Sequence, residues 1–134
     1  MTAHTPVFNP VAIIPVYNHP TTIGGMVQGV LAAGLHCILV DDGSEPGCAT
    51  VLDALALQHR ARVTLLHLAQ NQGKGGAVMT GMRHALAQGY SHALQIDADG
   101  QHVVEDIPGF IATSRGRPEA LECGAPRYDA NGTQ

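Results

Sequence analysis

Short apolar runs alternate along this chain with longer segments in which apolar residues recur at helical spacing. The runs are rich in β-branched residues, which predicts buried strands, and several longer segments end at a glycine, which predicts helices. The predicted strands are 11–14, which Pro15 closes, and 37–40, 63–68, 93–96 and 120–124. The predicted helices are 21–33, 47–60, a segment that opens at the glycine-rich loop 71–76 and ends near 88, and 104–114. This alternation predicts a three-layer α/β/α sandwich with a mostly parallel, Rossmann-like sheet.

Polar motifs follow the first, second and fourth predicted strands, where each strand ends. They are 15–18, Asp41–Asp42 and Asp97–Asp99. In open α/β sheets, ligands bind at the carboxyl ends of the strands near a switch in strand order, so we expect these motifs to gather at one edge. Asp97 and Asp99 are alternate residues of an extended segment and face the same side, where their oxygens suit a hard divalent ion such as Mg2+ or Mn2+. The convergence of the three motifs predicts a nucleotide site.

Each motif also has a purely structural interpretation. Asp41-Asp42-Gly43-Ser44 is typical of a turn after a strand, and paired aspartates at a strand end can be structural. The segment Gly73–Gly76 matches neither the Walker nor the dinucleotide-binding pattern, which favours close backbone packing of its glycines, with Lys74 either solvated or near phosphate. A calcium-binding EF-hand is excluded, since His102 and Pro108 occupy the positions that need glycine and glutamate.

Composition limits the class of protein. The 134 residues form one domain or part of one, with 45% apolar residues, a formal net charge of −4 and no basic surface that suggests nucleic acid. The three cysteines have no metal-type spacing and favour a reducing compartment. We find no signal peptide and no apolar run of the roughly 20 residues that span a membrane, so we expect a cytoplasmic protein.

With these loops in place, the chain resembles the family 2 glycosyltransferases of the GT-A fold. The segments that carry the resemblance lie in the family's order between about residues 10 and 128: Val11–Asn18, Ile38–Ser44, Asn71–Gly75, Asp97–His102 and Gly124–Tyr128. The first two look like the family's opening strand and its base-binding turn. The third matches an Asn-x-Gly-Lys-Gly loop, and the last is similar to a Gly-Ser-Arg-Tyr stretch. The fourth matches the DxD segment, in the form seen in polyprenyl-phosphate mannosyl- and glucosyltransferases.

The resemblance implies a role for each matched residue. It implies a nucleoside pocket lined by Pro15, Tyr17 and Val40, with Asp42 hydrogen-bonded to the base. It implies that Asp97 contacts the ribose or a metal-bound water, and that Asp99 binds Mg2+ or Mn2+ across the diphosphate. The other nucleotide-sugar-binding residues that it implies are Asn18, Asp41 as a helper to Asp42, Lys74, Ala98 and Arg127, and Gln101 joins Asp97 and Asp99 as a metal ligand.

The activity that the resemblance implies is inverting, metal-dependent transfer of a hexose from a UDP- or GDP-sugar. The form of the DxD segment favours a lipid-linked acceptor such as polyprenyl phosphate, in cell-envelope glycan synthesis at the inner face of a membrane with peripheral membrane contact. Two departures from the family matter. His19 stands where the family usually has glutamate. No carboxylate after Asp99 is a convincing general base, and we expect that base in the C-terminal half with which family members continue.

We therefore interpret residues 10–128 as the donor-binding portion of a glycosyltransferase, between a leader (1–9) and a tail (129–134), with its sheet truncated after the fifth strand. Such a sheet exposes an edge, which the missing half or a homodimer would cover. The alternative is a truncated or degenerate module that binds a nucleotide without transferase activity. A metal-dependent nucleotidyltransferase is disfavoured, because the loop 15–18 lacks the glycines and basic residues that this class needs.

Overall fold

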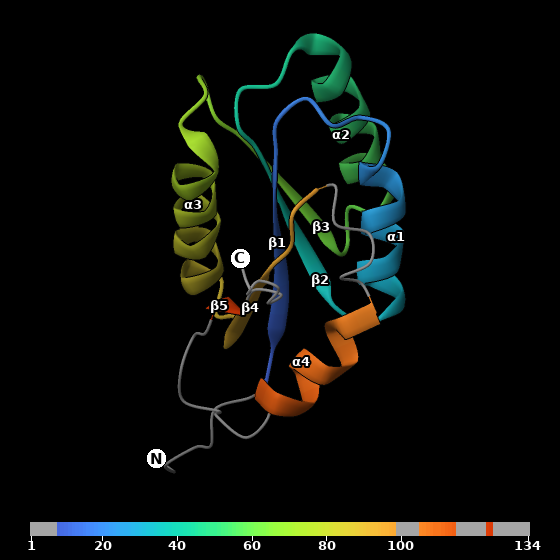
Figure 1. The fold of residues 1–134 in the computed structure, drawn as a ribbon, viewed down its shortest axis with the longest axis vertical. Coiled ribbons are helices and arrows are strands. Elements are labelled where there is room, and N and C mark those ends of the chain that lie inside the picture. The colour runs from blue at the N-terminus through green and yellow to red at the C-terminus, as the bar shows by residue number, and fades with distance from the viewer. Residues whose placement is uncertain (1–7, 99–104, 115–122, 125–134) are drawn as a thin grey trace.

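The structure is a computed structural model that describes residues 8–98, 105–114 and 123–124. Strands and helices alternate along these residues (Figure 1). The strands are β1 (Pro10–Val16), β2 (His36–Asp41), β3 (Val63–His67), β4 (His92–Gln95) and β5 (Cys123–Gly124). The helices are α1 (Ile23–Ala32), α2 (Pro46–Gln58), α3 (Gly73–Ala87) and α4 (Ile107–Ser114). The predicted alternation of strands and helices is therefore confirmed for the described part of the chain.

The strands pair in parallel, in the order β3-β2-β1-β4-β5. The chain builds the sheet outward from β1 to β3, and α3 then carries it back across the sheet to β4 on the other side of β1. The strand order thus switches between β1 and β4, which is where open α/β sheets bind ligands. Helices α1, α2 and α4 cover one face and α3 covers the other, so the predicted three-layer sandwich is confirmed (Figure 1).

The central strand β1 supplies both halves of the core, because alternate side chains of a strand point to opposite faces. Ala12, Ile14 and Val16 are buried in the layer under α1, α2 and α4. Val11 and Ile13 are buried in the layer under α3. No described helix is both long and apolar enough to cross a membrane.

The end of β1 differs from the prediction. The strand does not stop at Pro15 but continues to Val16 and stays in register with β2. Residues two apart in a strand direct their backbone polar groups to the same neighbouring strand. The carbonyl of Ile13 accepts the Ile96 N–H at 3.0 Å, so the N–H that Pro15 lacks would also point toward β4. Pairing between β1 and β4 ends at Ile13. Pro15 is therefore tolerated where the ladder to β4 ends, and the two strands separate beyond it.

The glycines of the loop and of α3 bear out the predicted close packing only in part. A Cβ added at Gly75 would meet nothing within 4 Å, whereas one at Gly76 would lie 2.9 Å from Gln72 Cβ. The close approach to the sheet is at Gly81, where an added Cβ would lie 2.6 Å from Ile13 Cγ2 and 3.2 Å from Val40 Cγ2. The middle of α3, rather than its first turn, is thus the part that lies against the sheet.

Candidate functional site

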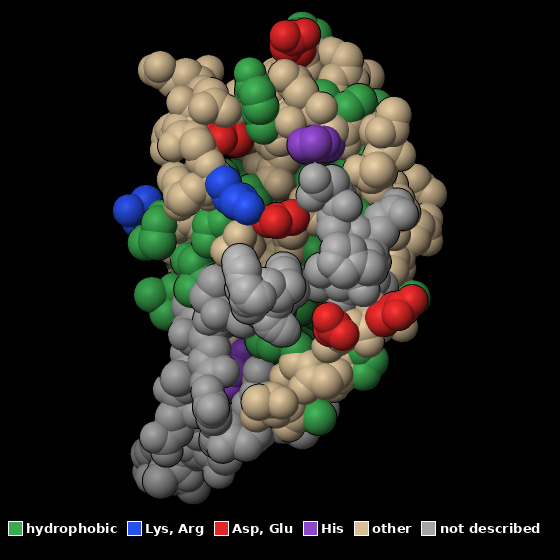
Figure 2. Space-filling view, in the orientation of Figure 1, with side chains coloured by type: hydrophobic (Ala, Val, Ile, Leu, Met, Phe, Trp, Pro, Cys, Tyr) green, Lys and Arg blue, Asp and Glu red, His purple; other side chains and the backbone are tan. Residues whose placement is uncertain are grey.

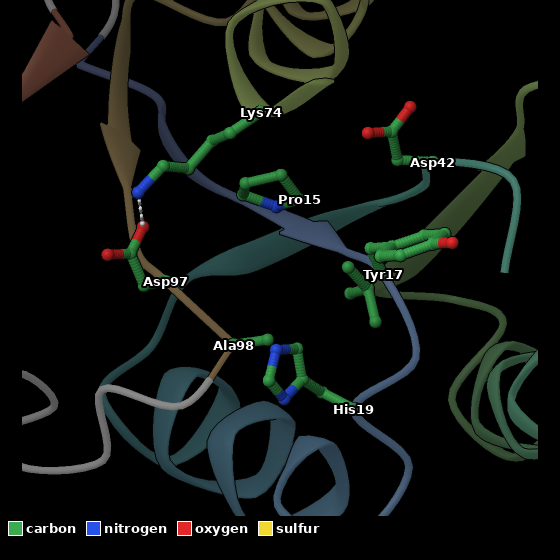
Figure 3. A pocket seen from close by; sticks show the side chains of 8 residues that line it. Pro15, Tyr17, His19, Asp42, Lys74, Asp97 and Ala98 are labelled. Carbon is green, nitrogen blue, oxygen red and sulfur yellow. Dashed lines mark hydrogen bonds and ion pairs between the residues drawn. The ribbon is translucent and has the colours of Figure 1, made fainter. Parts of the chain in front are cut away.

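A cavity of about 250 Å3 opens where β1 and β4 separate (Figure 3). It lies at the carboxyl ends of the strands, beside the first turn of α3. Figure 2 shows basic, acidic and histidine side chains gathered on the upper part of one face of the molecule. The residues that line the cavity are Pro15, Val16, Tyr17, His19, Asp42, Lys74, Asp97 and Ala98. A lining that combines an aromatic ring, small apolar groups and a few charges is typical of a ligand-binding pocket.

The loop after β1 is fixed to the turn after β2 by Asn18. This residue has a left-handed backbone, with a φ of 55°, which asparagine adopts more readily than most residues. Its N–H donates to Ser44 Oγ at 3.0 Å, and its Oδ1 accepts the Glu45 N–H at 2.8 Å. Its neighbours Tyr17 and His19 line the cavity. Tyr17 leaves 48% of its surface exposed, so an aromatic face is available to a planar ligand.

Asp42 is a buried carboxylate that lines the cavity and holds the loop before α3. Its Oδ1 accepts the Gln72 N–H at 2.6 Å, and its Oδ2 accepts the side-chain amide of Asn71 at 3.1 Å. Gly43 follows, where an added Cβ would lie 2.7 Å from the Asn71 nitrogen, so the loop can approach only a glycine. Since a carboxylate has about four acceptor positions, Asp42 keeps the capacity to accept from a ligand.

Asp41 faces the other side of the sheet, toward α2. Its Oδ1 accepts the Ser44 N–H at 2.8 Å, and its Oδ2 lies 2.6 Å from Nδ1 of His67. Nε2 of the same ring lies 2.9 Å from Asp53 Oδ1. The hydrogen bond to Asp53 is the main cause that raises the pKa of His67; partial burial opposes it, and Asp41 adds to it.

Lys74 and Asp97 meet across the cavity, with Lys74 Nζ 3.0 Å from Asp97 Oδ1 (Figure 3). Their side chains are 57% and 39% exposed, and exposed ion pairs contribute only about 0.2–1 kcal/mol, so a ligand can separate them. The next residue, Ala98, is held by its carbonyl, which accepts the Thr22 hydroxyl at 3.0 Å. That hydrogen bond ties the segment after β4 to the start of α1.

The predicted metal ligands are described only in part. Asp99 and Gln101 lie outside the described residues, as does Arg127. Among the residues that are described, no three His, Cys, Asp or Glu side chains form a group that could hold a metal ion. Asp97 is the described member of the predicted set, and its part-exposed carboxylate at the cavity has the oxygen chemistry that suits a hard divalent cation.

Residues 11–133 match the family model described as Glycosyl transferase family 2. The chain belongs to this family. It is similar to a polyprenol monophosphomannose synthase of Mycolicibacterium smegmatis (34% identical over 128 residues, 90% of this chain and 46% of that protein). It is also similar to an undecaprenyl-phosphate mannosyltransferase of Micrococcus luteus (34% identical over 107 residues, 77% of this chain and 43% of that protein). The chain thus spans less than half the length of these two relatives.

A solved structure supports the assignment of this family 2 chain to the GT-A fold. It is the mannosyltransferase PcManGT from Pyrobaculum calidifontis, in complex with GDP-Man and Mn2+. The TM-score is 0.53 and the identity 25%, over 61% of this chain and 25% of that one. The resemblance to family 2 glycosyltransferases drawn from the sequence is therefore confirmed.

The structure of this family 2 chain brings most of the described predicted residues into one cavity. Those that line it are Pro15, Tyr17, Asp42, Lys74, Asp97 and Ala98. Three others do not line it: Asn18 supports the loop, Asp41 faces His67, and Val40 is buried under α3. Sequence reasoning missed His67. The available signal was its place at the end of the third strand, since parallel pairing sets it in register with Asp41.

Proposed function

We propose that the cavity binds a nucleotide-diphosphate sugar, and that this chain is the donor-binding part of an inverting glycosyltransferase with a polyprenyl phosphate acceptor. One observation carries the proposal. This family 2 chain has a cavity at the switch in strand order, and four chemical groups from separate parts of the chain meet in it. They are the aromatic ring of Tyr17, the carboxylates of Asp42 and Asp97, and the ammonium group of Lys74. Their chemistry suits the three parts of such a donor, which are a base, a sugar and a diphosphate.

The base is assigned to the part of the cavity near Tyr17 and Asp42. The exposed ring of Tyr17 offers a stacking surface, and Asp42 offers acceptor positions for the N–H groups of a base. The solved relative holds GDP-Man, which supports a nucleotide-diphosphate sugar as the donor. Lys74 is assigned to the diphosphate, because an ammonium group pairs strongly with phosphate oxygens.

A divalent cation fits the carboxylate end of the cavity. Asp97 would hold it, with Asp99 and Gln101 proposed from the sequence, and the Mn2+ of the solved relative supports a divalent ion there. Such a cation would neutralise the departing diphosphate. Lys74 contacts Asp97 through an exposed ion pair, so it is free to turn to a phosphate oxygen when the donor binds.

The proposed transfer needs no general base from this chain. The acceptor oxygen forms a bond to the anomeric carbon on the face opposite the diphosphate, which inverts the configuration. The bond from that carbon to the diphosphate oxygen breaks, and its electron pair stays on the diphosphate. A phosphate acceptor is already ionised, so no proton has to be removed. The names of the two bacterial relatives, polyprenol monophosphomannose synthase and undecaprenyl-phosphate mannosyltransferase, support this acceptor class.

Calorimetric titration of the chain with GDP and UDP, each with and without Mn2+, tests the proposal. We compare the wild type with Asp97→Asn and with the charge-matched control Asp106→Asn, an exposed carboxylate before α4 that does not line the cavity. We expect one nucleotide to bind only with Mn2+, and Asp97→Asn to weaken that binding roughly tenfold or more, as for the loss of a charged contact.

Two results would contradict the proposal. Equal loss of affinity in both variants would mean that the effect is one of overall charge, and failure of both nucleotides to bind would mean that this chain forms no donor site. Nucleotide binding without transfer to polyprenyl phosphate would favour the alternative, a binding module without transferase activity.

A further inference from the structure

We infer that His67 is a positioning residue for the nucleotide site: in its protonated form it holds Asp41, and through Asp41 the loops that carry Tyr17, His19 and Asp42. The inference rests on the proposed nucleotide site. It adds a role for a residue that does not line the cavity, and it makes the affinity for the donor dependent on pH.

The ring of His67 lies between two carboxylates. Its Nδ1 is 2.6 Å from Asp41 Oδ2, and its Nε2 is 2.9 Å from Asp53 Oδ1. A neutral imidazole has one N–H and one lone pair, so it would donate to one carboxylate and set its lone pair against the other. The imidazolium donates to both. The titratable groups that face the ring are Asp41 from β2 and Asp53 from α2, and both raise the pKa of His67.

Hydrogen bonds continue from Asp41 to the wall of the cavity. Asp41 Oδ1 accepts the Ser44 N–H at 2.8 Å, and Ser44 Oγ accepts the Asn18 N–H at 3.0 Å. Asn18 lies between Tyr17 and His19, which line the cavity. His67 is therefore connected to the nucleotide pocket through two side chains and two backbone amides.

The burial of Asp41 makes this connection sensitive to the charge on His67. Asp41 is only 3% exposed, and a buried carboxylate is costly unless a cation or hydrogen-bond donors compensate it. When His67 loses its proton, Asp41 loses a cationic partner, and it must share with Asp53 the one N–H that the neutral ring keeps. The adjacent residue, Asp42, donates its backbone N–H to the carbonyl of Val16 at 2.8 Å, so a shift at Asp41 reaches both walls of the cavity.

The expected consequence is tighter donor binding while His67 is protonated. Affinity should fall by roughly fivefold or more as the pH rises through the pKa of His67, a coupling at the lower end of those between linked sites. Since linkage is reciprocal, a bound donor should raise the pKa of His67.

The test measures binding of GDP-mannose and UDP-glucose, each with Mn2+, from about pH 5.5 to about pH 8.5. This range extends to both sides of the ordinary pKa of histidine. Their diphosphate is esterified at both ends and does not itself titrate in this range. Asp53→Asn removes a charge that raises the pKa of His67, so the pH at which affinity falls should move lower. His67→Asn keeps an amide that can donate to Asp41 but cannot titrate, so the pH dependence should flatten.

His19→Gln is the matched control, because His19 is the histidine that lines the cavity in the described part of the chain. The fall of affinity with pH should persist in this variant. If it disappears in His19→Gln, or stays in place in Asp53→Asn, the inference is wrong.

A nucleotide-free measurement separates the inference from the proposed function. The amide NMR signals of Ser44 and Asn18 should follow the protonation of the His67 ring. Signals that follow His67 in a protein that binds neither sugar nucleotide would refute the proposed function and support the hydrogen-bonded connection. Signals that ignore His67 in a protein that binds one of them would refute the inference and leave the proposed function standing.

Discussion

Replacing Gly81 with alanine tests how α3 is seated on the sheet. The added Cβ would lie 2.6 Å from Ile13 Cγ2 and 3.2 Å from Val40 Cγ2, and both side chains are fully buried. Helix propensity favours alanine over glycine by about 1 kcal/mol, whereas overpacking a core costs about 1–3 kcal/mol. A contact as short as 2.6 Å places the cost at the upper end. We therefore expect a net loss of about 2 kcal/mol in the free energy of unfolding, or roughly 8 °C in Tm.

Gly75→Ala in the same helix is the matched control, because its added Cβ meets nothing within 4 Å. We expect it to stabilise the protein by up to about 1 kcal/mol through helix propensity alone. Urea denaturation followed by circular dichroism measures both variants. If Gly81→Ala is as stable as Gly75→Ala, α3 does not approach the sheet at Gly81, and the position of Lys74 on its first turn would need another explanation.

Three further predictions follow from single contacts. Lys74→Met should change stability by less than about 1 kcal/mol, because its pair with Asp97 is exposed, but should raise the Kd for the nucleotide roughly tenfold in calorimetry; an unchanged Kd would exclude contact with the phosphates. The pKa of His67 is raised in the folded protein, so the stability that Asp53 contributes should be fully present below the unfolded-state pKa of about 6.5 and lost as the pH rises through the folded-state pKa. Urea denaturation of wild type and Asp53→Asn measures this contribution, and a difference in their free energies of unfolding that widens as the pH rises would contradict the prediction. Burial raises the pKa of Cys37 to about 12, so iodoacetamide at neutral pH should modify this thiol only in unfolded protein. Mass spectrometry measures the modification, and rapid labelling of Cys37 in the native protein would contradict its burial.

The fold could be predicted because its signals are local. The glycines expected to end two helices, Gly34 and Gly89, have φ values of 90° and 86°, which glycine adopts without strain. Pro15 is the exception. Local propensity predicts a strand end there, but the missing N–H lies on the side where pairing with β4 has already ended, so β1 continues along β2.

The site could be predicted only as far as strand ends define it. Asp42 and Asp97 lie in the cavity because they follow parallel strands, and that much is visible in the sequence. Asp41 faces away because consecutive residues of an extended chain point to opposite sides, and it meets His67 only through the pairing of β2 with β3. Pairing between residues far apart in sequence, like the fit of Gly81 against the sheet, is set by tertiary structure that no local pattern encodes.

The charges around the cavity give a physical reason to expect a cation with the donor. Two carboxylates, Asp42 and Asp97, and one ammonium group, Lys74, are the acidic and Lys/Arg side chains among the described lining residues. Asp42 is compensated by the donors of Asn71 and Gln72, and Asp97 by Lys74. If Lys74 turns to the dianionic diphosphate, Asp97 is left beside it without that partner, and two like charges close together repel each other. A divalent cation between Asp97 and the diphosphate would remove that repulsion, so the charges of this chain support the metal dependence that we propose.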